Sequence, residues 1–211
     1  MYNKLYERNW YIWYNCSGDI MKISIGISAR HVHLCQRDFE ALFGKDGHLT
    51  KYVDLNQPTM FAANEKVSII TDGGRIDNVR IVGPIRPYTQ VEISKTDSYK
   101  LKLNPPVRGS GDLDNSESVY IEYNGNRIFA KNSCIIANRH IHIRTCDLDK
   151  YGFKDNQIVK LKVNSIKGGT LDNVFIKATD EAYFEAHLDL DDANANFIND
   201  GDIGEIISEW V

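Results

Sequence analysis

The chain has 211 residues, enough for one large domain or two small ones, and its 42% hydrophobic and 26% charged residues are typical of a globular protein. Its formal net charge of −4 argues against a general nucleic-acid-binding protein. No apolar run approaches the ~18 residues of a transmembrane helix and no signal peptide is visible, so we expect no membrane insertion. Four cysteines without a Cys-x-x-Cys pair indicate a reducing, cytoplasmic compartment and no thiolate-rich structural zinc site.

Residues 1–20 differ from the rest of the chain because aromatic side chains crowd into them, and no later segment repeats the pattern. Two interpretations fit this N-terminal extension: an aromatic, partly amphipathic targeting helix, or a misassigned translation start that makes Met21 the true first residue. Mass spectrometry of the native N-terminus distinguishes them. Residues 21–28 follow, alternate in polarity with a period of two, and predict a β-strand.

Short strands and tight turns dominate the rest of the chain. The patterns predict strands over 66–70, 76–82, 119–123, 127–130, 158–163 and 171–178. They predict short helices over 36–43 and 145–151, each stopped by a glycine. A mainly β fold of two small β-barrels is therefore favoured over a doubly wound α/β sheet.

A four-residue motif occurs twice, as Arg30-His31-Val32-His33 and as Arg139-His140-Ile141-His142. The two copies hold four of the six histidines in the chain. Residues i and i+2 of a strand point to the same face, so each copy can direct two imidazoles at one point, as a metal site requires. A single His-x-His on a strand is more often an ordinary surface pair, and the duplication favours the metal interpretation.

The repeat extends beyond the histidines. Residues 73–79 match residues 168–174 at an offset of 95, and the same offset places Glu92 on His187. The histidine pairs are 109 residues apart, so the first copy holds 14 additional residues between its histidines and its Gly-Gly turn. We expect that insertion to form a helical or loop segment.

Together the repeats predict two pseudo-equivalent metal sites. Their candidate ligands are His31, His33 and Glu92 in the first copy, and His140, His142 and His187 in the second. Three protein ligands with one open position are the usual arrangement of a catalytic zinc ion, whereas a structural zinc is more often closed by four.

Several motifs together resemble the PduL-type phosphotransacylases, the phosphate propanoyltransferase family. They occur in the expected order in residues 28–34, 89–94, 106–112 and 138–142. The resemblance covers the chain from about Met21 to its C-terminus. It implies two β-barrels with short helical caps, a two-zinc site between them, and acyl transfer between coenzyme A and phosphate.

The resemblance also implies a domain organisation and partners. The first strand would join the barrel of the C-terminal half, giving one barrel from 21–29 plus 138–211 and another from 30–137. Residues 1–20 would be an encapsulation peptide. The protein would form a homodimer and would associate with shell or lumen proteins of a bacterial microcompartment. Short-chain acyl-CoA and phosphate would be its substrates, and no nucleic acid or membrane partner is expected.

The same resemblance suggests functional residues. The six repeat residues named above fall on the family's metal ligands, and Arg86 falls on its phosphate-binding arginine. Arg30, Arg108 and Arg139 are further candidates to bind phosphate or coenzyme A, although Arg30 and Arg139 could instead orient carboxylates. Lys95 stands where the family commonly has arginine, which preserves the charge but loses the bidentate guanidinium.

The expected chemistry is direct attack of phosphate on the thioester carbonyl, since no Gly-x-Ser-x-Gly motif marks a serine nucleophile. One alternative is a zinc-dependent hydrolase of thioesters or phosphoesters. Others are a non-catalytic, metal-stabilised β-barrel module and, less favoured, a cupin-like oxygenase. The residues leave open whether the acyl group is propanoyl or acetyl and which metal is native.

Overall fold

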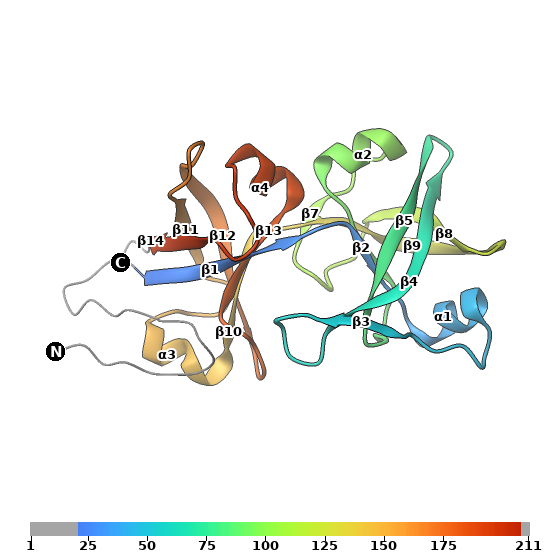
Figure 1. The fold of residues 1–211 in the computed structure, drawn as a ribbon, viewed down its shortest axis with the longest axis horizontal. Coiled ribbons are helices and arrows are strands. Elements are labelled where there is room, and N and C mark those ends of the chain that lie inside the picture. Colours follow the sequence, from blue (N-terminus) through green and yellow to red (C-terminus); the bar gives the residue numbers. More distant parts are fainter. Residues whose placement is uncertain (1–20, 208–211) are drawn as a thin grey trace. The chain divides into compact units, whose positions relative to one another are not determined.

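The structure is a computed structural model that describes residues 21–207 (Figure 1). Both interpretations of residues 1–20 therefore fall outside the described part of the chain. The described residues form two compact units, one from residues up to Ser28 together with those from Arg139 onward, and the other from Ala29 to Asn138. No helix within residues 21–207 is both long and apolar enough to cross a membrane.

The unit that contains the C-terminal half is a closed six-stranded barrel in the order β1-β13-β10-β12-β11-β14. Its elements are β1 (Met21–Ser28), β10 (His140–Arg144), a 3-10 helix (Thr145–Asp147), α3 (Leu148–Tyr151), β11 (Ile158–Val163), β12 (Thr170–Thr179), β13 (Glu185–Asp189), α4 (Leu190–Ala195) and β14 (Ile203–Ile207).

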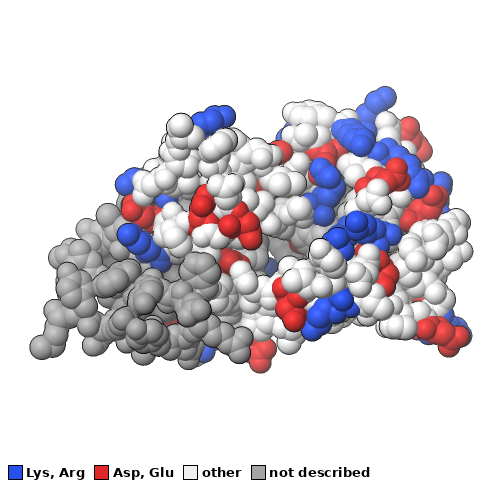
Figure 2. All heavy atoms as spheres, viewed as in Figure 1, with Lys and Arg blue, Asp and Glu red and all other residues white. Residues whose placement is uncertain are grey.

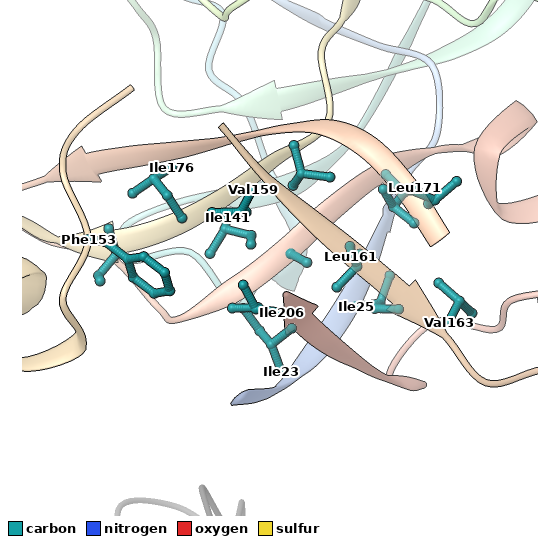
Figure 3. Close-up of a cluster of buried hydrophobic side chains, with 14 of the residues drawn as sticks. Ile23, Ile25, Ile141, Phe153, Val159, Leu161, Val163, Leu171, Ile176 and Ile206 are labelled. Carbon is teal, nitrogen blue, oxygen red and sulfur yellow. The ribbon is translucent and has the colours of Figure 1, made fainter. Parts of the chain in front are cut away.

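Alternate residues of these strands fill the interior of the barrel. Figure 3 shows part of this core, which includes the buried side chains of Ile23, Ile25, Ile141, Leu161, Ile176 and Ile206. Each fully buried isoleucine or leucine contributes about 1.5–3 kcal/mol through removal of apolar surface from water. The strand β1 is thus held in the barrel by both its hydrogen bonds and its core residues, although it lies far from the other strands in sequence.

The second unit is built from the first half of the chain. Its elements are β2 (His31–His33), α1 (Gln36–Phe43), β3 (Lys51–Asp54), β4 (Phe61–Thr71), β5 (Gly74–Gly83), β6 (Gln90–Glu92), α2 (Lys95–Leu101), β7 (Val107–Arg108), β8 (Glu117–Tyr123) and β9 (Asn126–Ala137).

Six of these strands pair in a ring, β4-β5-β2-β6-β9-β8, which closes because β8 pairs with both β9 and β4. The remaining strands, β3 and β7, add to β4 and β9. A second apolar cluster, which includes Val32, Ile69, Ile81, Val91 and Ile121, fills this barrel. The prediction of a mainly β fold with two pseudo-repeated barrels and short helices is therefore confirmed.

The two rings have the same sequence of parallel and antiparallel pairings. The parallel pair β2/β5 corresponds to β10/β12, and the parallel pair β6/β9 corresponds to β13/β1. Each half of the chain thus begins with a strand, β1 or β9, that completes the barrel formed by the other half. The register agrees with the sequence repeat, because Gly26 pairs with His187 as Ile135 pairs with Glu92.

The additional residues of the first copy contain β3, an edge strand whose four residues are all exposed. It has no counterpart in the C-terminal barrel. On the face shown in Figure 2, basic and acidic side chains of the described residues are interspersed, an arrangement typical of the surface of a globular domain.

The helix α1 is fixed to its barrel by Asp38, a residue only 5% exposed. The Asp38 carboxylate accepts hydrogen bonds from Thr89 Oγ1 at 2.7 Å and from Arg37 Nε at 2.9 Å. Burial alone would raise the pKa of Asp38, but hydrogen bonds from Arg37, Thr89 and Cys35 outweigh it and lower the pKa. Ionised Asp38 therefore stabilises the folded state.

This shift gives the first testable prediction. Because the folded pKa of Asp38 is depressed, its stabilisation is present above the unfolded pKa of about 4 and is lost as the pH falls through the folded value. We expect Asp38→Asn to lower the free energy of unfolding at neutral pH by about 1–3 kcal/mol. Urea titrations should show this deficit shrinking below about pH 4. Asp54→Asn, at a carboxylate 73% exposed, is the control, and a deficit for Asp38→Asn that is independent of pH would contradict the assignment.

Candidate functional site

The first ligand cluster lies on the antiparallel pair β2/β6. His31 stands opposite Glu92, and His33 stands opposite Gln90, so these four alternate side chains share one face of the pair. The intervening residues Val32 and Val91 point to the opposite face and are fully buried in the apolar cluster of the barrel. The core residues therefore fix the direction in which the polar side chains project.

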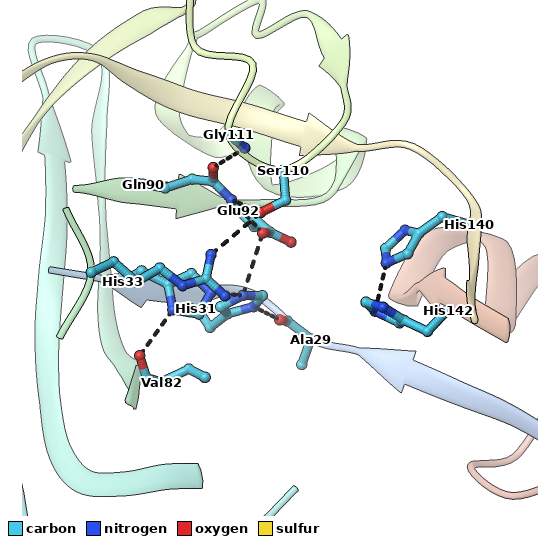
Figure 4. A network of polar contacts seen from close by, with 11 residues as sticks. Ala29, His31, His33, Val82, Gln90, Glu92, Ser110, Gly111, His140 and His142 are labelled. Carbon is cyan, nitrogen blue, oxygen red and sulfur yellow. Dashed lines mark hydrogen bonds and ion pairs between the residues drawn. The ribbon is translucent and has the colours of Figure 1, made fainter. Parts of the chain in front are cut away.

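The ligand atoms of this cluster converge (Figure 4). The Nε2 atoms of His31 and His33 are 3.1 Å apart, and His31 Nε2 is 3.6 Å from Glu92 Oε1. Each imidazole is held from behind, because Nδ1 of His31 bonds the Ala29 carbonyl and Nδ1 of His33 bonds the Val82 carbonyl, both at 2.9 Å. A nitrogen facing a carbonyl must donate, so in the neutral rings both lone pairs lie on Nε2.

Two imidazole lone pairs and a carboxylate that face one another are suited to bind a cation. The pKa values of the two histidines shift in opposite directions. Burial lowers the pKa of His31, but attraction and hydrogen bonding to Glu92, with the hydrogen bond to Ala29, outweigh it and raise the pKa. Burial, the neighbouring His31 and the charge of Arg86 lower the pKa of His33 well below its ordinary value.

The second cluster repeats this geometry on the antiparallel pair β10/β13. His140 stands opposite His187, and His142 stands opposite Glu185. The Nε2 atoms of His140 and His142 are 3.1 Å apart, and the ring centroid of His187 lies 5.3 Å from that of His140 and 4.6 Å from that of His142. The three rings thus face one another as the residues of the first cluster do.

Within each cluster, one ligand atom from every residue lies within 4.8 Å of the others. Nitrogen and carboxylate oxygen in sets of three, with neutral imidazoles fixed by backbone acceptors in the first cluster, are the donors that a catalytic zinc ion takes. The residues of each barrel therefore fit a divalent metal ion.

Arg86 lies in the loop between β5 and β6, beside the first cluster. Its backbone N–H donates to the Leu34 carbonyl at 2.9 Å, and its Nη1 donates to Ser110 Oγ at 3.3 Å. Its positive charge opposes protonation of both His31 and His33, but it is a smaller cause than burial for each residue, and Glu92 still raises the pKa of His31 overall. A guanidinium in this position is suited to hold an anion near the candidate metal site.

The arginines that precede the two histidine pairs form equivalent ion pairs. Arg30 Nε lies 2.8 Å from Asp97 Oδ2, and Arg139 makes contacts of 2.7 and 2.8 Å with the two carboxylate oxygens of Asp192. The two aspartates occupy the same position in α2 and α4. These contacts correspond to the alternative in which Arg30 and Arg139 orient carboxylates.

The last of the predicted arginines, Arg108, pairs with Asp112 at 3.1 Å. Both side chains are 40% or more exposed, so the pair itself contributes little to stability. Arg108 belongs to β7. The loop that follows β7 contains Ser110, which accepts a hydrogen bond from Arg86.

Sequence analysis missed the side chains that contact the ligands from the same strands, Gln90 and Glu185. The Gln90 amide donates to Glu92 Oε1 at 2.6 Å, and Glu185 Oε2 lies 2.9 Å from His187 Nε2. Their positions were available in the repeat, because the 95-residue offset that joins Glu92 to His187 also joins Gln90 to Glu185.

Gly26 provides space for the second cluster. A Cβ atom added there would lie 3.0 Å from the Glu185 carboxylate and 3.2 Å from the His187 ring, closer than ordinary contacts. We expect Gly26→Ala to displace one or both side chains and to weaken metal binding at this cluster by about tenfold or more. A chelator-competition titration measures this. Gly169→Ala, whose added methyl meets no atom within 4 Å, is the control, and equal zinc affinity in both variants would contradict the prediction.

Two closed β-barrels of one topology, each with three converging ligands on equivalent strands, define a duplicated β-barrel protein built around two candidate metal sites. Comparison with known proteins assigns this class to a family. A phosphate propanoyltransferase family model matches residues 24–199.

Curated relatives cover most of the chain. The phosphate propanoyltransferase of Thermotoga maritima is 43% identical over 186 residues, which are 88% of this chain and 89% of the relative. The phosphate propanoyltransferase of Priestia megaterium is 45% identical over 86% of this chain and 84% of the relative. That of Clostridioides difficile is 38% identical over 89% of this chain and 90% of the relative. The chain belongs to the phosphate propanoyltransferase family and is an enzyme of the acyltransferase class.

Proposed function

We propose that this enzyme transfers a short acyl group, propanoyl or a similar chain, between coenzyme A and inorganic phosphate. The names of its relatives support this reaction. The observation that carries the proposal is the position of Arg86, a half-buried arginine beside a cluster suited to a metal ion. Its Nη1 donates to Ser110 Oγ, the same hydroxyl that Gln90 joins to the candidate ligand Glu92. That arrangement brings an anion-binding group close to a candidate Lewis-acid site.

We propose one zinc ion in each cluster. His31, His33 and Glu92 would hold the first, and His140, His142 and His187 the second. Bound zinc would polarise the thioester carbonyl and stabilise the departing thiolate. The residues themselves prepare the first site, because the carbonyls of Ala29 and Val82 fix the tautomers of His31 and His33 with Nε2 free to ligate.

Arg86 would bind phosphate. A planar guanidinium matches two phosphate oxygens at once, and Ser110 restricts the orientation of the Arg86 side chain. A phosphate oxygen held in this way would attack the thioester carbonyl carbon, the new carbon–oxygen bond would form, and the carbon–sulfur bond would break. Coenzyme A would leave as its thiolate and accept a proton from solvent.

We favour direct attack over a covalent acyl-enzyme. No Gly-x-Ser-x-Gly motif marks a serine nucleophile, and the sequence around Cys35 has no mark of a nucleophilic cysteine. Burial raises the pKa of Cys134 to about 12, so this thiol is also a poor nucleophile at neutral pH. A ping-pong kinetic pattern, or isolation of an acylated enzyme after incubation with labelled acyl-CoA, would contradict direct attack.

A phosphate-dependence assay tests the proposed function. The purified full chain, incubated with propanoyl-CoA, should release free coenzyme A only when phosphate is present and should form acyl phosphate in equal amount. Release without phosphate would identify a hydrolase instead. Tight zinc with no turnover under either condition would support a non-catalytic module, and repeating the assay with acetyl-CoA and longer chains defines acyl-chain preference.

The remaining family-based expectations are also proposals. We propose a homodimer and a location inside a bacterial microcompartment, with residues 1–20 as the targeting segment. We also propose the domain division predicted from the sequence, 21–29 plus 138–211 and 30–137. Fluorescent fusions with and without residues 1–20 test the targeting role.

A further inference from the structure

The residue two positions before the third ligand differs between the barrels. Gln90 precedes Glu92, and Glu185 precedes His187. The two residues are equivalent in the fold as well as in the sequence, because Gln90 stands opposite His33 on β2 and Glu185 stands opposite His142 on β10. Each therefore shares the polar face of its strand pair with all three ligands.

Gln90 is fully buried, and both its amide oxygen and its amide nitrogen are hydrogen-bonded. Its Oε1 accepts the backbone N–H of Gly111 at 2.8 Å, which fixes the orientation of the amide. Its Nε2 then donates to Glu92 Oε1 at 2.6 Å and to Ser110 Oγ at 3.0 Å. Ser110 also contacts Arg86, so Gln90 connects a candidate metal ligand to the candidate phosphate-binding residue.

Glu185 is 3% exposed and has the complementary chemistry. Its Oε2 lies 2.9 Å from His187 Nε2, and its Oε1 accepts a hydrogen bond from Ser24 Oγ at 3.4 Å. A neutral imidazole that donates from Nε2 presents its lone pair on Nδ1, so Glu185 determines which nitrogen of His187 is available as a ligand.

In each barrel the chemistry of the partner thus matches the chemistry of the ligand. An amide donor faces the carboxylate of Glu92, and a carboxylate acceptor faces the imidazole of His187. We propose that Gln90 and Glu185 are positioning residues. Gln90 orients Glu92, and Glu185 orients His187, for metal binding. This inference rests on the metal binding included in the proposed function.

A mismatch should weaken the site. Gln90→Glu would place two carboxylates in contact, and their repulsion would turn Glu92 away from the metal or require a proton. Gln90→Leu would remove the donor and leave Glu92 unrestrained. Because groups that orient metal ligands typically contribute 10–100-fold to affinity, we expect either change to weaken zinc binding at the first cluster by about that factor.

The test measures zinc affinity by chelator competition, using zinc alone as the probe. The full chain carries His140→Ala and His142→Ala, so that only the first cluster binds. Gln90→Leu and Gln90→Glu are compared with Gln157→Leu, a control that removes a glutamine capping Lys154 N–H in the other barrel. The control should keep the parent affinity.

The decisive variant places the pair of the second barrel, a glutamate followed two residues later by a histidine, at positions 90 and 92. Glu92→His alone leaves an amide donor facing an imidazole, whereas Gln90→Glu with Glu92→His reproduces the pair of the second barrel. We expect the double variant to bind zinc at least about tenfold more tightly than either single variant. A general structural role of Gln90 would not produce this recovery, because the double variant departs further from the native residues.

The outcomes separate this inference from the proposed function. Parent affinity in both Gln90 variants, or a double variant no better than Glu92→His, would overturn the inference, as would a wild-type chain that binds no zinc. Should Gln90→Leu unfold in zinc-free thermal melts, the comparison of Glu92→His with the double variant decides alone. A wild type that binds two zinc ions without phosphate-dependent turnover would reject the function and leave the inference intact.

Discussion

Replacement of Arg86 by alanine is expected to remove nearly all turnover while the zinc content stays normal. The side chain contacts Ser110 and none of the six candidate ligands by hydrogen bond, so its loss should not open either cluster. A preorganised charge that stabilises a reacting anion is typically worth 10²–10³ in rate, and we expect a fall in kcat of about that size. Steady-state assays with varied phosphate, together with metal analysis of the same preparations, measure both quantities.

Two further variants define the role of Arg86. Arg86→Lys keeps the charge but loses the planar pair of donors, so its activity should lie between that of the wild type and that of Arg86→Ala. Arg127→Ala removes an exposed arginine of the same barrel that pairs with Glu122, and it should leave turnover unchanged. Parallel loss of zinc and activity in Arg86→Ala would make Arg86 a structural residue instead.

Removal of a single histidine from either cluster is expected to cost one zinc ion per chain and most of the activity. His33→Ala should empty the first cluster and His142→Ala the second, because only two candidate ligands would remain in each. A catalytic metal supplies several kcal/mol of transition-state stabilisation, so kcat should fall by about 10²–10⁴ for the cluster that assists the reaction. Metal analysis and phosphate-dependent release of coenzyme A provide the measurements.

His48→Ala is the matched control for these variants, because His48 belongs to neither histidine pair and to neither cluster. It should retain two zinc ions and full activity. If His33→Ala and His142→Ala both retained two equivalents of zinc with unchanged affinity, the candidate ligands would be wrong for the respective clusters.

The strands that carry the candidate ligands could be predicted from the sequence, because the same ligand pattern occurs in both halves of the chain. The spacing of His31 and His33 implied a strand with both imidazoles on one face, and the offset of 95 residues implied that Glu92 and His187 are equivalent. Convergence within each half followed from those two facts. It required only that β2 and β6, and likewise β10 and β13, pair in the same register.

Elements interrupted by irregular backbone were predicted less well. The strand expected to end at Ala130 continues to Ala137, because Asn132 adopts a positive φ of 47° and its N–H bonds Ser118 Oγ. The pairing of β8 with β9 shifts at the same place, so the Asn-Ser sequence forms a bulge within a strand and not a turn after it. The predicted helix over 145–151 is a 3-10 turn followed by α3.

The helices α2 and α4 were missed although their N-terminal residues indicate them. Ser94 and Asp97 form a reciprocal capping box, and Asp189 accepts the N–H of Asp192. With seven and six residues these helices are too short for hydrophobic periodicity to mark them. The partners of Gln90 were equally hidden, because the contact with Ser110 depends on how a loop folds back over β6.

The reciprocal placement of β1 and β9 has a consequence for the origin of the protein. A half-length ancestor with one copy of the repeat would contain every strand that a barrel needs. Its first strand, however, would pair with the strands of a second copy and not with its own. Such a polypeptide would reach closed barrels as a pair of chains that exchange these strands. Fusion of two copies would convert that intermolecular exchange into an intramolecular one, after which the two candidate metal clusters could diverge until one held Glu92 where the other held His187.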